Sequence, residues 1–450
     1  MISDTNTKRK YLNNKHNCDS WLLAMIKRVC DLPSRILQPS GFMFEDTMHA
    51  AKHNASIIEE HKFDMCQAIA PFPDSAILPG SEFRTTTTLQ QIWGQRFDWD
   101  MIRDILEHGC RYPIPDDPDE HRRLDDLHKM VEQGNHKSAT IPEHVEVVRK
   151  TYQKEIARGW VIPIPLPTLF QLRHADMTPI GIATQFTVNE AGEKILKKRL
   201  THDFSFPVAS GTSVNIEHVD NAMEECLYGY CFKRILHRIH ALRIQYPETP
   251  ILAARYDLDA AYRSLHVLIE HAVRSTTVVD DMAYIPLRLP FGVAAGPGLY
   301  STVSEAIFDL TNDILSEQSW DHLSLKSPHN SALESPDIQD EEADFAIALP
   351  LAIPIPITPT FCDGYIDDII CVSLAPDDFV ARCQAVAPLA AHTIFRLISD
   401  REPIERDDPL SLRKLAGKDM PSETKTILGW IVCTRSFKVY LPPDKSSLMD

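Results

Sequence analysis

The feature that most constrains this chain is a pair of adjacent aspartates, Asp367 and Asp368, inside residues 361–374, FCDGYIDDIICVSL. Apolar, β-rich residues on both sides predict a β-hairpin with the two aspartates at its tip. Adjacent carboxylates repel each other, whereas Mg²⁺ is held by a few carboxylates together with substrate phosphates. Taken alone, such a pair is more often a solvated acidic turn.

A second acidic segment changes that balance. Residues 251–258 predict a buried strand that ends at Asp257, and strand periodicity places Asp257 and Asp259 on the same face. The alternative is an ordinary strand end with a solvated aspartate. Together, however, strand and hairpin supply what two-metal nucleotidyl transfer requires, because carboxylates from separate strands fix one ion at the attacking hydroxyl and one at the leaving pyrophosphate.

These residues also carry a family resemblance. Residues 257–262, DLDAAY, resemble motif A of reverse transcriptases, and residues 365–368, YIDD, resemble their motif C. Between them, residues 289–300, LPFGVAAGPGLY, resemble motif B. Over about residues 141–445 the chain is similar to reverse transcriptases of LTR-type and DIRS-like retrotransposons. The resemblance implies an α+β, right-hand polymerase fold with fingers and palm, a truncated thumb, and RNA-directed DNA polymerase activity.

The resemblance implies a catalytic metal site as well. Asp257, Asp367 and Asp368 would be the catalytic carboxylates, and Leu258 would join them among the metal-binding residues. The implied cofactor is a pair of Mg²⁺ ions, with Mn²⁺ as an alternative. The implied partners are an RNA or DNA template–primer and dNTPs.

Further positions match the family's nucleotide-binding residues. Tyr262 falls where the family places an aromatic ring that excludes a 2′-hydroxyl, although a tyrosine after a strand also commonly fills a core. Arg199 matches an arginine that grips the triphosphate, a role suited to its planar guanidinium. By resemblance, Leu258 and Asp259 lend backbone amides to the phosphates, and motif B contributes Phe291 and Gly292.

Arg199 belongs to a predicted β-hairpin over residues 178–204. Lys194, Lys197 and Lys198 make this the most basic patch of the sequence. Solvated lysines on a surface strand are the alternative interpretation. The first strand of the hairpin lacks the lysine that family members usually carry before the turn, so that triphosphate contact is either missing or supplied by Lys194.

Composition bounds the function. The net charge of −17 argues against capture of nucleic acid by the molecule as a whole, so a polymerase would need a local basic channel.

Residues 317–359 form an acidic, proline-rich segment that predicts a disordered insertion. The ten cysteines include no Cys-x-x-Cys pair, so neither a zinc site nor a disulfide framework is expected. The absence of a long apolar run and of a signal peptide predicts an intracellular protein of cytoplasm or nucleus, neither secreted nor membrane-bound.

The predicted organisation has four parts: an N-terminal extension of unknown role (1–90), a helical region (91–160), fingers and palm with the acidic insertion (161–400), and the end of the palm with a primer-grip motif (401–450). The sequence does not indicate the oligomeric state. A rival enzyme interpretation takes residues 257–259 as the Asp-x-Asp of a glycosyltransferase, but it leaves the YIDD hairpin unexplained. A second rival is a retroelement remnant that binds nucleic acid without useful polymerisation.

Overall fold

A three-stranded antiparallel sheet, β4-β8-β7, carries both acidic segments. The computed structural model describes residues 19–42, 47–114, 119–188, 194–207, 213–216, 227–332, 358–411 and 421–442. Its strands are β1 (Val161–Pro165), β2 (Ile180–Val188), β3 (Lys194–His202), β4 (Ile251–Asp257), β5 (Thr277–Val279), β6 (Met282–Pro286), β7 (Thr360–Tyr365), β8 (Asp368–Leu374), β9 (Thr424–Ile427), β10 (Trp430–Cys433) and β11 (Lys438–Tyr440).

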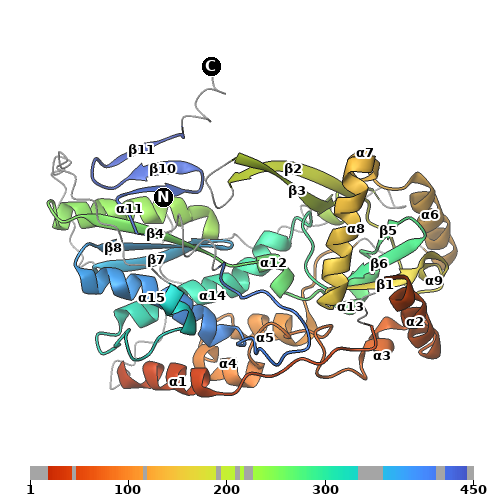
Figure 1. The fold of residues 1–450 in the computed structure, drawn as a ribbon, viewed down its shortest axis with the longest axis horizontal. Coiled ribbons are helices and arrows are strands. Elements are labelled where there is room, and N and C mark those ends of the chain that lie inside the picture. Colours follow the sequence, from red (N-terminus) through yellow and green to blue (C-terminus); the bar gives the residue numbers. More distant parts are fainter. Residues whose placement is uncertain are drawn as a thin grey trace.

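Helices lie on both sides of this sheet, and others lie beside the smaller β1-β6-β5 sheet (Figure 1). They are α1 (Asp19–Asp31), α2 (Thr47–Glu60), α3 (Met65–Ile69), α4 (Thr86–Trp93), α5 (Trp99–His108), α6 (Glu120–Gln133), α7 (Lys137–Thr140), α8 (Pro142–Ala157), α9 (Leu166–Leu169), α11 (Cys231–Gln245), α12 (Ala261–Ser264), α13 (Ile269–Val273), α14 (Gly296–Ser316) and α15 (Asp377–Ile394), with 3₁₀ turns η2 (Leu227–Tyr230) and η3 (Pro328–Ala332). None of these helices is long and apolar enough to span a bilayer.

The two faces of the central sheet belong to different cores. Because side chains alternate along a strand, Ile251 and Ala253 pack toward α11, while Ala254 and Tyr256 pack into the main core with α14 and α15. Figure 1 shows α11 on one side of β4, β7 and β8, with α14 and α15 on the other. The mixed α+β class and both predicted hairpins, β2–β3 and β7–β8, are confirmed.

The remaining strands form small antiparallel sheets within the described residues, in the orders β1-β6-β5 and β11-β10-β9. Within the region of residues 91–160 that the sequence predicts to be helical, α6 spans residues 120–133. Before it, α4 and α5 are separate helices, and Gly94 caps the end of α4.

Residues 71–88 differ from the linker that their proline-, serine- and threonine-rich composition predicts. Ile77 and Phe83 are buried, and the Phe83 ring stacks on Phe395 at a centroid distance of 4.8 Å. The Arg84 amide also donates to the carbonyl of Ile394. The N-terminal part of the described chain therefore shares the core of the central sheet.

The acidic segment that begins at residue 317 is also partly packed. The sequence predicts disorder throughout it, yet Trp320 is buried and its carbonyl accepts a hydrogen bond from Arg382 of α15. A buried tryptophan outweighs the local charge of residues 317–332. Residues 333–357 lie outside the described part of the chain.

Candidate active site

Two of the predicted catalytic aspartates face each other across the central sheet. Asp257 is the last residue of β4, and its antiparallel partner is Asp368, the first residue of β8. Tyr365 of β7 flanks Asp368 on the other side. Both strands are buried along most of their length and their two faces belong to different cores, so a shift of the pairing by one residue would move every side chain into the opposite core.

Asp367 is held in the two-residue turn between β7 and β8. Its carbonyl accepts a hydrogen bond of 3.0 Å from the Leu258 amide, which ties the turn to the end of β4. The preceding residue, Ile366, has φ 59°, a left-handed conformation that is rare for a β-branched side chain. Such strain persists only where surrounding contacts enforce it, and it concentrates at functional sites.

The electrostatics of two tyrosines report how close these carboxylates lie. Burial raises the pKa of the Tyr300 phenol, and the charges of Asp367 and Asp257 raise it further. Burial likewise raises the pKa of Tyr262, followed by the effect of Asp367. Two carboxylates from separate strands therefore act on the same phenol.

This donor set fits Mg²⁺ by its chemistry. Hard divalent ions prefer carboxylate oxygens, and the strand ends bring three carboxylates to one edge. Arg255 partly balances one of them, since its Nε lies 3.7 Å from an oxygen of Asp368. Within the described residues, the three aspartates do not bring one oxygen each within 4.8 Å of the others.

The motif B loop is anchored to the end of β3. The His202 amide donates to the carbonyl of Phe291, and Gly292 lies directly against the His202 backbone. Asn215 clamps the same loop, because its amide nitrogen donates to the carbonyl of Gly292 and its oxygen accepts from the amide of Ala294. The basic hairpin and the motif B loop are thus joined by backbone contacts.

Tyr262 lies between two aromatic rings. Its ring meets Phe291 edge-on at 5.2 Å and Tyr300 at 5.6 Å. Phe291 stays 38% exposed, so this aromatic group reaches the surface. The structure therefore brings Tyr262 and Phe291 together beside Asp367.

Arg199 is exposed on β3, opposite Ala183 of β2. The neighbouring Lys198 donates to the carbonyl of Glu143 in α8. The Lys194 side chain lies outside the described part of the structure. The predicted triphosphate contact of Arg199 stays a prediction.

The predicted phosphate-binding role of the Leu258 and Asp259 amides stays a prediction, and the structure gives each amide a partner within the protein. The Leu258 amide donates to Asp367, and the Asp259 amide donates to the carbonyl of Pro409 at 2.9 Å. Both donors are therefore already used within the protein. The metal-binding role of Leu258 stays a prediction, and its side chain is buried.

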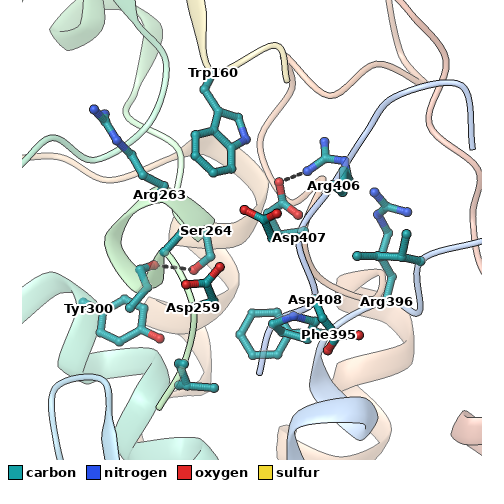
Figure 2. Close-up of a pocket in the computed structure, with 16 residues that line it drawn as sticks. Trp160, Asp259, Arg263, Ser264, Tyr300, Phe395, Arg396, Arg406, Asp407 and Asp408 are labelled. Atoms are coloured by element: carbon teal, nitrogen blue, oxygen red, sulfur yellow. Dashed lines mark hydrogen bonds and ion pairs between the residues drawn. The ribbon is translucent and has the colours of Figure 1, made fainter. Parts of the chain in front are cut away.

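The partner of the Asp259 amide belongs to a segment over residues 407–411 that lies against the end of β4. It pairs with the end of β4 through a bridge between Leu258 and Leu410, and the Ser411 amide donates to the carbonyl of Asp257. Figure 2 shows Asp407 and Asp259 in the pocket that this segment lines. The pKa of Asp259 is raised, first by the loss of water around its carboxyl group and then by the charges of Asp407 and Asp257.

Two contacts around the candidate site have no signal in the sequence. Nothing in the local pattern indicated that Asn215 would bond to a loop 77 residues later. Residues 407–411 likewise have no periodicity that predicts a contact with β4.

Comparisons with known proteins add weak structural similarities. No protein-family model and no curated protein matches the sequence. A foamy viral protease-reverse transcriptase in complex with double-stranded DNA is 11% identical, with a TM-score of 0.36, covering 76% of this chain and 51% of that chain. A second foamy viral protease-reverse transcriptase complex with DNA is 14% identical, with a TM-score of 0.34, covering 70% of this chain and 44% of that chain. The telomerase of Candida albicans, with a fragment of telomeric RNA, is 8% identical, with a TM-score of 0.27, covering 95% of this chain and 77% of that chain. The chain thus spans about half the length of the foamy viral proteins.

Proposed function

We propose that this chain is a reverse transcriptase of a retroelement, with a right-hand polymerase fold whose palm is the β4-β8-β7 sheet and whose fingers include the β2–β3 hairpin. The observation that carries the proposal is the pairing of Asp257 with Asp368, with Asp367 in the adjoining turn. An exposed acidic turn alone would need no such partner strand. The proposed reaction joins dNTPs to a primer 3′-hydroxyl.

In this proposal Asp257, Asp367 and Asp368 would hold two Mg²⁺ ions. When bound, such ions activate the attacking hydroxyl and neutralise charge on the leaving pyrophosphate. The chain's own part is to fix the three carboxylates on a rigid sheet, since phosphoryl transfer depends mainly on positioning and charge. Main-core packing of Ile369 and Cys371 supports that rigidity.

Contacts with template, primer and dNTP are proposed for surfaces near this edge. Lys197 and Arg199 are exposed on β3 and could form the local basic path that a chain of net charge −17 needs. Trp430 and Tyr440 of the β9–β11 sheet are 40% and 45% exposed, and exposed aromatic rings suit stacking on bases.

A nucleic-acid-binding remnant is the second candidate, and the segment over residues 407–411 favours it. This segment occupies the amide of Asp259, and the Asp367 turn occupies that of Leu258. A chain locked in this arrangement would keep the carboxylates but bind the triphosphate poorly. Polymerisation then requires the segment to move.

Primer extension tests the proposal. The full chain is given poly(rA)/oligo(dT), dTTP and Mg²⁺, with a second series in Mn²⁺, and is compared with Asp367→Asn. We expect incorporation by the wild type and a loss of at least about a hundredfold in the variant, because a charge that stabilises the transition state is removed. The matched control is Asp100→Asn, which removes a carboxylate whose side chain is 86% exposed on α5.

The outcomes separate the two candidates. Incorporation that only Asp367→Asn abolishes supports the polymerase. A folded wild type that binds the template–primer in a filter assay but incorporates nothing in either ion supports the remnant. Equal incorporation by wild type and Asp367→Asn would refute the proposed catalytic site.

A further inference from the structure

Three potential metal ligands meet at Asp408, within the segment over residues 407–411. They are His329 in η3, His392 in α15 and Asp408, and one ligand atom from each lies within 4.8 Å of the other two. Nε2 of His329 contacts Oδ2 of Asp408, and the two imidazole rings lie 4.6 Å apart. Among the described residues, these are the three His, Cys, Asp or Glu side chains whose ligand atoms lie this close together.

The partners of these side chains leave the right atoms for an ion. Nδ1 of His392 bonds to Oγ of Ser327, and this outer hydrogen bond leaves the other ring nitrogen as the one that can bind an ion. Oδ1 of Asp408 accepts the Leu410 amide, so Oδ2 faces His329. Histidine ligands in metal sites commonly hold their second nitrogen in such an outer hydrogen bond.

Burial gives the group a closed side and an open side. His392 is 3% exposed, whereas the side chains of His329 and Asp408 are 24% and 23% exposed. An ion can therefore enter from solvent while α15 holds the inner ligand. Three protein ligands with one open side resemble a site that completes its coordination with water.

We propose that His329, His392 and Asp408 form a binding site for Zn²⁺ or a similar first-row ion, which fastens the 407–411 segment to α15. Two imidazoles and one carboxylate favour Zn²⁺ over Mg²⁺, which prefers oxygen ligands alone. Tetrahedral bonds of about 2.0–2.2 Å place two ligand atoms of one ion about 3.3–3.6 Å apart. The three ligand atoms, which lie within 4.8 Å of one another, would therefore have to approach each other by side-chain rotation when an ion binds. This site is separate from the three aspartates of the central sheet.

The fastened segment reaches the candidate active site through its backbone. Pro409 accepts the Asp259 amide, and the Ser411 amide donates to Asp257. Zn²⁺ bound to Asp408 would therefore fix Pro409 and Ser411 in their hydrogen bonds with the end of β4. The consequence for catalysis rests on the proposed function, whereas Zn²⁺ binding does not.

A titration without nucleic acid or dNTP tests the site. The full chain, freed of metal, competes for Zn²⁺ with a chromophoric chelator, and Co²⁺ is then added to record its visible absorption. We expect one tight equivalent in the wild type, with a Co²⁺ spectrum that lacks the sulfur charge-transfer band of cysteine ligands. His329→Gln is expected to weaken this binding by more than the about 10–100-fold that loss of an outer hydrogen-bond partner costs. His121→Gln, an exposed histidine of α6, is the matched control and should bind like the wild type.

Two further variants distinguish metal binding from misfolding and from an ion pair that binds no metal. Asp408→Asn removes a ligand charge with little change in volume, and Ser327→Ala removes the outer partner of His392 without touching Asp408. We expect both to weaken Zn²⁺ binding, Ser327→Ala by about 10–100-fold. In the wild type, Zn²⁺ should also slow hydrogen exchange of the Asp259 and Ser411 amides.

No tight equivalent in the folded wild type, or equal binding by wild type and His329→Gln, would show that the group is only an ion pair with a hydrogen bond. Because no polymerase substrate is present, that failure would leave the proposed function untouched.

Discussion

Gly292 lies so close to His202 that a Cβ atom at residue 292 would fall 1.9 Å from the His202 carbonyl oxygen. Its φ of 115° is also one that residues with side chains rarely adopt. The motif B loop therefore touches the end of β3 at a point where only glycine fits.

Gly292→Ala is expected to lower the free energy of unfolding by more than about 1 kcal/mol, because it adds a backbone clash to the strain of a positive φ. Denaturant unfolding followed by circular dichroism measures the change. The matched control is Gly134→Ala, where φ is 72° and the added Cβ would have no neighbour within 4 Å. Equal losses in the two variants would show that the contact with His202 contributes nothing.

A second close approach links the β7–β8 hairpin to α14. A Cβ at Gly364 of β7 would fall 1.9 Å from Cζ of Phe308, a ring that is buried in α14. Gly364→Ala is expected to cost about 1–3 kcal/mol of stability through overpacking.

Phe308→Leu in the same chain should recover part of that cost, with a coupling of at least about 0.5 kcal/mol in a double-mutant cycle. Gly229→Ala, at a site with open space around the added Cβ, serves as the control. Strict additivity of Gly364→Ala and Phe308→Leu would contradict the contact.

The strands of the central sheet could be predicted because their signals are local. Short apolar, β-rich runs indicate β4, β7 and β8, and the Tyr-Ile-Asp-Asp sequence in a short turn predicts the β7–β8 hairpin. The pairing of Asp257 with Asp368 depends on the register between β4 and β8, which is set by packing in the fold.

The rest depends on contacts between segments that carry no such signal. The resemblance implies that the Leu258 and Asp259 amides bind phosphate, whereas in the structure they donate to the carbonyls of Asp367 and Pro409, which packing brings near them. Residues 71–88 have the composition of a linker, yet their few apolar side chains enter the main core. His329, His392 and Asp408 show no metal-ligand spacing and meet only in the fold.

His271 makes stability depend on pH. Its Nδ1 accepts the Tyr112 amide, which requires an imidazole that is unprotonated at that nitrogen. Burial lowers the pKa of His271 to about 4, with smaller effects from Glu270, which raises it, and from Arg274 and Arg111, which lower it. The unfolded chain, with a histidine pKa near 6.5, therefore binds the proton more tightly than the folded chain.

The sign follows from this difference. The contribution of His271 is fully present above about pH 6.5 and is lost as the pH falls from there toward about 4. We expect His271→Gln to lose less stability than the wild type between pH 7.5 and pH 5 in urea unfolding. Some pH dependence remains, because burial also lowers the pKa of His202, to about 3. A parallel loss in His271→Gln and wild type would refute the assignment, and His121→Gln should follow the wild type.

Tyr262 provides the sharpest test of the nucleotide site under the proposed polymerase activity. Its ring lies between Phe291 and Tyr300 beside the Asp367 turn, where a side chain can reject a nucleotide by a clash with one added oxygen. Tyr262→Val should reduce the preference for dTTP over UTP by on the order of tenfold or more, because the clash is removed. The measurement is the ratio of kcat/KM for the two nucleotides on poly(rA)/oligo(dT). Tyr262→Phe keeps the ring and should keep the ratio, so an unchanged ratio in Tyr262→Val would place the sugar elsewhere.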